Sequence, residues 1–384
     1  MQNQSAPLRF RNLIIVLAAF GVGLVLDLFL DRIISDSSVR QLLMLAAVNV
    51  MIAVSLNVIN GMAGQFSIGH AGFVGLGAYA SGIVAANLHQ SFGGGDVAFG
   101  KSFIIVPLGM LAGGLIAGLA GFIVGLPSLR LKGDYLAIVT LGFAEIVRLT
   151  IATAKPAGDE PLRAICGHIG KDGFFGPIGS CVSGAISSLG GQNGYQGPKN
   201  EGVPLYAGPF WLIGITTLVV VLALRLKFSG WGRALRALRE DEIASASVGV
   251  DPTKYKVRSF VIAAVGAGVA GALSAIMRDG TPIVQPETYN FQASFDAITM
   301  VILGGSGSVS GAVLGALFVT FTVKAIELVQ GTNFIQDLRH HAEWLDLNAL
   351  RMIIYAAVLI LLMVMRPEGV FGERELFKKK RATA

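Results

Sequence analysis

The sequence predicts an all-α polytopic membrane protein with about nine or ten transmembrane segments. Of its 384 residues 53% are hydrophobic and only 14% are charged, whereas soluble domains carry roughly 25% charged residues. Apolar runs of about 20 residues, the length that crosses a bilayer, recur along the whole chain. The 50 glycines agree with this class, because glycine lets membrane helices approach closely.

Nine apolar segments are long enough to cross a bilayer, and they are joined into a single transmembrane domain over residues 1–384. The first is a span rather than a signal peptide, because no small-residue cleavage site follows it. A shorter apolar segment, residues 294–304, is expected to cross or re-enter the membrane. The nine candidate spans are residues 13–30, 39–59, 71–88, 103–125, 134–154, 206–226, 256–277, 309–329 and 350–366.

The basic residues predict the orientation of these spans. With both termini in the cytoplasm, the cytoplasmic segments contain 18 Lys and Arg and the outside segments contain 8, as the positive-inside rule requires. Residues 225–258 and the basic tail 367–384 then lie inside, and the long loop 155–205 lies in the periplasm. The net charge of +6 therefore reflects orientation rather than nucleic-acid binding.

Residues 225–258 form a charged island that carries eight of the chain's 30 Lys and Arg. Ser229 predicts a helix N-cap, Gly249 a left-handed helix stop, and Asp251 the cap of the next span. A membrane-surface helix that only orients the protein is one interpretation. The mixed charge favours a second, a lever that contacts a soluble partner. An apolar stripe at helical spacing is formed by Trp231, Leu235 and Leu238.

Two glycine-rich breaks, residues 60–72 and 304–311, interrupt the hydrophobic pattern. Irregular backbone at membrane depth survives only where protein buries it or where it lines a watery cavity. The breaks are therefore candidates for the wall of a transport pathway, with ordinary cytoplasmic turns as the alternative.

Charged residues inside predicted spans are either functional or structural. Glu145 and Arg148 share a helix face and can pair, and Asp27 lies in the first span. Structural ion pairs or subunit contacts are favoured over substrate ligands. In the periplasmic loop, Cys166 and Cys181 either form a disulfide or remain free thiols, since both alternatives fit an oxidising compartment.

Enzyme chemistry is not indicated. Gly95, Gly100, Lys101 and Ser102 match the spacing of a phosphate-binding P-loop, but the preceding buried strand that such a loop needs is missing. No metal-ligand cluster of the HExxH or CxxC type occurs in the sequence.

Four motifs resemble the larger permease subunit of high-affinity branched-chain amino acid ABC importers. They occupy residues 56–73, 131–143, 232–249 and 366–372, and the resemblance covers roughly residues 39–370. It implies the bundle of a type II ABC importer permease with re-entrant breaks, in a bacterial inner membrane. Related permeases carry urea or short amides, so those importers remain an alternative, as does an ion-coupled secondary transporter.

The resemblance also implies partners and site residues. The partners are a second permease, two cytoplasmic ATPases that bind the ATP and a periplasmic substrate-binding protein; the chain itself holds no cofactor. Coupling to the ATPases is expected from Arg236, Arg239, Glu240, Asp241, Glu242 and Gly249. The transport pathway is expected to be lined by Asn60, Gln65, Ser67, His70, Gly304 and Gly305.

Overall fold

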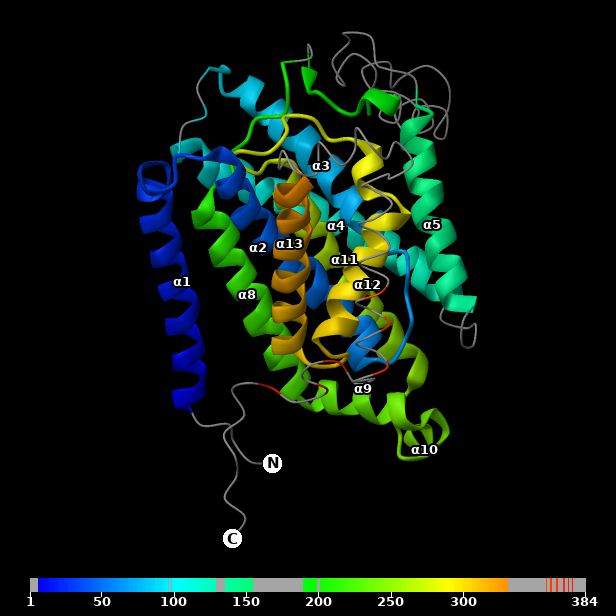
Figure 1. The fold of residues 1–384 in the computed structure, drawn as a ribbon. Helices are drawn as coiled ribbons and strands as arrows, with labels where there is room; N and C mark the ends of the chain where they lie inside the picture. The colour runs from blue at the N-terminus through cyan, green and yellow to red at the C-terminus, as the bar shows by residue number, and fades with distance from the viewer. Residues whose placement is uncertain are drawn as a thin grey trace, which may run out of the picture.

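The computed structural model is a bundle of long helices with a short bent pair at one end (Figure 1). It describes residues 6–95, 97, 99–128, 135–154, 189–198 and 201–330, and single positions at 357, 360, 364, 369, 372 and 375. Its long helices are α1 (Ala6–Ile33), α2 (Ser37–Asn57), α3 (His70–Ser91), α4 (Phe99–Ser128), α5 (Tyr135–Ala152), α8 (Pro209–Phe228), α11 (Pro252–Ala275), α12 (Phe291–Gly304) and α13 (Val309–Gln330).

Seven of these helices are long and apolar enough to cross a membrane, and they correspond to the first seven predicted spans. The helix α13 coincides with the predicted span 309–329, and its apolar stretch is Val309–Ala325. The shorter apolar segment 294–304 is part of α12, whose 14 residues are too few to cross the roughly 30 Å hydrocarbon core. The predicted span 350–366 falls almost entirely outside the described residues.

The core is built around α11, which packs against α2, α3 and α4. Small residues make this packing possible: a Cβ on Gly77 would overlap the backbone of Gly268, and a Cβ on Gly113 would overlap the Gly77 carbonyl oxygen. In contrast, α1 packs mainly against α8 at the edge of the bundle (Figure 1), and most of its apolar side chains are exposed as for a lipid-facing helix.

Short elements close the two ends of the bundle. One end carries the 3₁₀ turns η2 (Gly191–Asn193) and η4 (Pro286–Tyr289), held by the isolated β-bridges Tyr195–Val284 and Ala207–Met277. The opposite end carries α9 (Gly230–Glu240) and α10 (Glu242–Ser247), which lie across the ends of the long helices (Figure 1). The middle of the charged island, residues 230–247, thus lies at one end of the bundle.

Candidate functional site: the elbow and the two membrane breaks

The helices α9 and α10 with their caps, residues 229–249, form a bent segment at one end of the bundle that we call the elbow. Ser229 caps α9, because its hydroxyl accepts a hydrogen bond from the Gly232 amide at 3.1 Å. Leu235 and Leu238 of the predicted stripe are buried. The Trp231 ring stacks on Tyr255 of α11 with centroids 5.9 Å apart. The stripe therefore fastens the elbow to the bundle.

The single helix expected up to Gly249 is wrong in one respect, because the chain bends at Asp241. This residue is extended (φ −153°), and its carboxylate accepts hydrogen bonds from the amides of Ile243 and Ala244, both at 2.9 Å. It therefore ends α9 and caps α10. Gly249 then has φ +89°, the left-handed stop that was predicted. The Lys254 amide donates to Asp251 at 3.1 Å, a hydrogen bond that lowers the Asp251 pKa.

The expected coupling residues divide between two faces of the elbow. Arg236 and Arg239 turn towards the bundle and are half-buried, whereas Glu240, Asp241, Glu242 and Gly249 are exposed. Two of the acidic side chains form ion pairs: Glu240 pairs with Arg239 at 3.0 Å, and Glu242 pairs with Lys256 at 2.6 Å.

Two exposed apolar side chains of the elbow were missed by sequence reasoning. Ile243 is 83% exposed and Val248 is 79% exposed, and they flank α10. Both side chains stand beside charged residues, and their exposure leaves them available to a partner that covers the elbow. The signal was present in the sequence as an Ile and a Val that do not fit the buried stripe of α9.

Arg239 links the elbow to the first break. Its Nη1 donates a hydrogen bond to the Gly61 carbonyl oxygen at 2.9 Å. Gly61 lies in η1 (Val58–Met62), a single π-helical turn that continues α2; such π-turns are frequent at functional sites. Gly64 follows with φ +67°, and a Cβ there would overlap the Arg239 side chain. The break is therefore shaped to receive this arginine.

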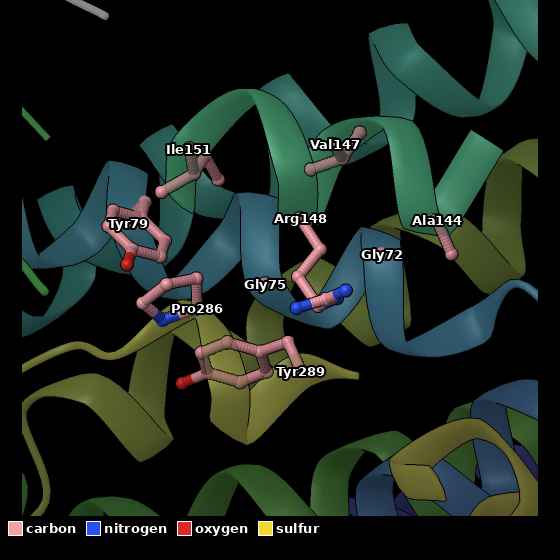
Figure 2. Close-up of a pocket in the computed structure, with 9 residues that line it drawn as sticks. All are labelled: Gly72, Gly75, Tyr79, Ala144, Val147, Arg148, Ile151, Pro286 and Tyr289. Atoms are coloured by element: carbon pink, nitrogen blue, oxygen red, sulfur yellow. The ribbon is translucent and has the colours of Figure 1, made fainter. Parts of the chain in front are cut away.

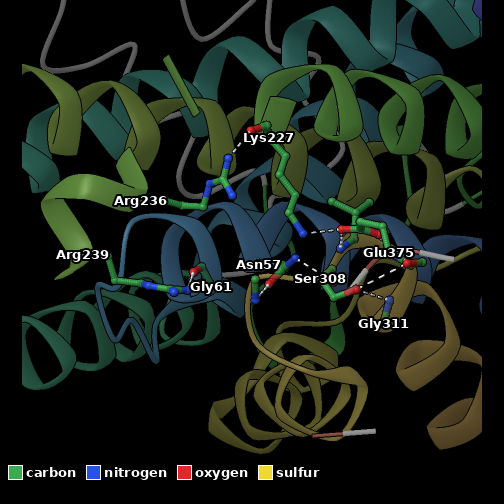
Figure 3. Close-up of polar contacts among 11 residues, drawn as sticks. Asn57, Gly61, Lys227, Arg236, Arg239, Ser308, Gly311 and Glu375 are labelled. Atoms are coloured by element: carbon green, nitrogen blue, oxygen red, sulfur yellow. Dashed lines mark hydrogen bonds and ion pairs between the residues drawn. The ribbon is translucent and has the colours of Figure 1, made fainter. Parts of the chain in front are cut away.

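Asn57, the last residue of α2, joins the first break to the second. Its Oδ1 accepts from the Gly307 amide at 2.8 Å, and its Nδ2 donates to the Ser308 carbonyl oxygen at 3.0 Å. The Asn57 side chain is fully buried. Figure 3 shows Asn57, Gly61 and Ser308 lying together beside Arg239. The two breaks, 250 residues apart in sequence, are therefore one structural unit.

Lys227 and Glu375 add a second polar link at the same place (Figure 3). The Lys227 Nζ lies 2.5 Å from Glu375 Oε1, and each side chain is only 4% exposed. The same carboxylate accepts hydrogen bonds from the amides of Val309, at 2.7 Å, and Ser310, at 2.9 Å, and from the Ser310 hydroxyl. Burial raises the Glu375 pKa, but the hydrogen bonds from Lys227 and Ser310 outweigh it and leave the pKa lowered.

The expected pathway residues of the first break are mostly buried against protein. Asn60 Oδ1 accepts from the Ser67 amide at 3.2 Å, which closes residues 60–67 into a loop. His70 is fully buried, and its Nε2 lies 2.8 Å from the Ser55 hydroxyl. That hydroxyl donates to the Ile52 carbonyl oxygen, so the histidine nitrogen is the donor in this contact.

Three side-chain atoms of this break have no hydrogen-bond partner among the described residues: Gln65 Oε1, Ser67 Oγ and His70 Nδ1. In the second break, Gly304 and Gly305 are both buried, and a Cβ on Gly304 would overlap Gly311. The polar pathway candidates thus lie together in residues 60–70. Gly304 lies where α12 contacts α13.

The intramembrane charges form ion pairs, as the sequence favoured. Asp27 pairs with Arg278 at 3.0 Å, and Arg148 pairs with Glu145 at 2.9 Å and with Glu287 at 2.8 Å. Figure 2 shows Arg148 beside Tyr289 in a pocket between α3, α5 and η4. Because this guanidinium is already held by two carboxylates, the pocket is a structural junction rather than an anion site.

The remaining sequence motifs do not form a site in the described part of the chain. Lys101 donates to the Gly94 carbonyl oxygen at 2.9 Å, and Ser102 accepts from the Trp211 indole at 3.2 Å, so both side chains hold the loop in place. Cys166 and Cys181 lie outside the described residues. Within the residues that the structure describes, no group of three His, Cys, Asp or Glu is arranged to hold a metal ion.

A helical bundle with broken membrane segments, tied through buried polar bridges to an exposed elbow, defines the class of multi-pass membrane permeases. The comparisons with known proteins give the family. Residues 38–363 match the model of the permease component of branched-chain amino acid transport systems, so the chain belongs to that family, whose members are non-catalytic transmembrane components.

Individual relatives agree with this assignment. The high-affinity branched-chain amino acid transport permease LivM of Salmonella typhimurium is 34% identical over 329 residues, which cover 84% of this chain and 67% of the relative. A probable LivM of Methanocaldococcus jannaschii is 27% identical, over 85% of this chain and 91% of its own length. The permease LivH of Escherichia coli is 28% identical over 44% of this chain and 48% of its own. No solved structure matches the chain.

Proposed function

We propose that this chain is one of two permease subunits of an ATP-driven importer of branched-chain amino acids in a bacterial inner membrane. Both termini and the elbow lie in the cytoplasm. A LivH-type permease is the second subunit, two cytoplasmic ATPases bind the ATP, and a periplasmic protein delivers the substrate. The resemblance to LivM and LivH supports this composition.

The observation that carries the proposal is that the elbow has an exposed outer surface and an inner surface that contacts the first break. Its outer surface offers Ile243, Val248 and the carboxylate of Glu240 to solvent. Its inner surface sends Arg239 to the backbone of the first break. A soluble ATPase that contacts the outer surface can therefore displace the break through a side chain and without an intervening flexible loop. The first and second breaks, including Gln65, Ser67 and His70, are proposed to line the pathway that this displacement opens.

The ion pairs favour a structural role for Asp27 and Glu145 over a role as ion ligands, because each of these carboxylates is paired with an arginine. Substrate choice between branched-chain amino acids and urea or short amides rests with the proposed binding protein.

Uptake measurements test the proposal. The complete complex in proteoliposomes should accumulate labelled leucine only with ATP inside the compartment that faces the elbow and with binding protein on the other side. Replacing Ile243 and Val248 by Asp should abolish ATPase binding while the permease still inserts. Uptake that follows an ion gradient without any ATPase would contradict the proposal, and uptake of urea but not leucine would shift the substrate.

A further inference from the structure

The C-terminal segment reaches back to the second break and to the root of the elbow. Gly369, with φ +77°, is buried so close to the second break that a Cβ on it would lie 2.5 Å from Gly305 Cα and 2.6 Å from the Ile302 carbonyl oxygen. Gly372 is also buried, with φ +52°. Six residues after Gly369, Glu375 enters the space between α8 and α13 (Figure 3).

Glu375 serves two elements with one carboxylate. On one side it caps the first turn of α13 through the amides of Val309 and Ser310. On the other it pairs with Lys227, two residues before Ser229, the cap residue of the elbow. At 4% exposure for both side chains, water screens the pair little, and breaking a buried pair by removing one partner is costly.

Two side-chain links therefore connect the elbow region to the breaks, one from Arg239 within the elbow and one from Lys227 in the last turn of α8, directly before it. Arg239 reaches the first break at Gly61, and Lys227 reaches the second break through Glu375. The Lys227 carbonyl oxygen also accepts a long hydrogen bond from Arg236, at 3.5 Å, which ties the lysine's backbone to α9. Nothing comparable would be needed if the basic tail served only to orient the protein in the membrane.

We propose that the Lys227–Glu375 pair transmits movement of the elbow to the second membrane break, so that Glu375 is a positioning residue for coupling and the C-terminal segment is part of the coupling apparatus. This inference rests on the proposed function. It assigns to the C-terminal segment a role beyond orienting the protein through its positive charge. Glu375, 148 positions from Lys227, becomes necessary for converting ATP hydrolysis into transport.

The test separates coupling from folding by measuring transported leucine per ATP hydrolysed in proteoliposomes that hold the complete complex. Lys227→Met cuts the link but leaves Glu375 on the α13 N-terminus, whereas Glu375→Gln weakens the link and the cap. Both variants should lower the transport-to-hydrolysis ratio about tenfold. The double variant should be no worse than either single variant, because residues that act through one contact are not additive.

A matched control removes a partly buried ion pair elsewhere. Arg40 pairs with Asp279 at 3.1 Å in the opposite end of the bundle, so Arg40→Met should lower stability and leave the ratio unchanged. A normal ratio in Lys227→Met with a reduced ratio in Glu375→Gln would overturn the inference, because Glu375 would then be only a helix cap. Additive losses in the double variant would overturn it as well.

Two further measurements cover variants that fail to insert and a wild-type complex that fails to transport. If either variant fails to insert, Glu375→Asp replaces it: the shorter carboxylate should lower the ratio, and an unchanged ratio counts against the inference. If the wild-type complex shows no ATP-dependent leucine uptake, the proposed function itself fails, which the wild-type arm alone reveals.

Discussion

The Arg239 guanidinium donates to the Gly61 carbonyl oxygen at 2.9 Å across 178 positions of sequence. The acceptor belongs to a π-helical turn, where the backbone does not follow the regular α-helical hydrogen-bond pattern. An arginine at this place both satisfies a backbone oxygen and connects the first break to the surface of the molecule. The contact makes α9 the element from which a force on the elbow reaches the membrane segments.

Arg239→Gln should therefore uncouple the transporter. A hydrogen bond from a charged donor contributes about 1.5–3 kcal/mol, so the loss should reduce leucine uptake roughly ten- to hundredfold in proteoliposomes. ATP hydrolysis by the complex should persist. Arg225→Gln, an exposed arginine in the last turn of α8, is the control and should transport normally. Equal uptake by the two variants would remove Arg239 from the coupling route.

Gly61→Ala should destabilise the protein. A Cβ at this position would overlap Asn57 Oδ1 and the Gly307 amide nitrogen, and overpacking of this kind typically costs about 1–3 kcal/mol. Thermal unfolding in detergent should show a clearly lower midpoint. In Gly142→Ala of α5, no atom of the described residues outside the helix's own backbone lies within 4 Å of the added carbon, so the midpoint should stay the same or rise, since Ala favours helices.

Asn57→Leu should separate the two breaks. The change removes both hydrogen bonds, to Gly307 and Ser308. It leaves the buried Gly307 amide without its acceptor, at a cost of about 1–3 kcal/mol, whereas the Ser308 carbonyl oxygen still accepts from the Ala312 amide. Hydrogen exchange of residues 58–69 and 305–311 should accelerate together. Asn87→Leu is the matched control, because Asn87 donates to the Ile83 carbonyl oxygen of its own helix and does not bridge the two breaks. Faster exchange in one break alone would show that the breaks are independent.

The lowered pKa of Glu375 predicts that the free energy of unfolding decreases at acidic pH. Its folded-state pKa lies below the ordinary value of 4.5, so its contribution to the free energy of unfolding is complete above pH 4.5 and is lost as the pH falls through the folded-state pKa. The unfolding midpoint of the wild type should drop in this range. Glu375→Gln should start lower and lack this component of the drop; a parallel pair of curves would contradict the assignment.

The sequence determined the class, the spans and the local caps of the elbow. These follow from composition, from apolar runs and from residue types at fixed spacing, which act over a few residues of chain. The capping roles of Ser229 and Asp251 and the stop at Gly249 are examples. The motifs were also sufficient for the family, which the comparisons confirm.

Only the tertiary structure decided what these elements contact. Asn57 and Ser308, or Lys227 and Glu375, are unremarkable residue types far apart in the chain, and no local pattern pairs them. The helix break at Asp241 likewise escaped the sequence, because an aspartate surrounded by charged residues fits an exposed helix as well as a cap. Buried polar groups must find partners wherever packing brings them, and that packing, set by small residues around α11, joined the two breaks and the elbow into one unit.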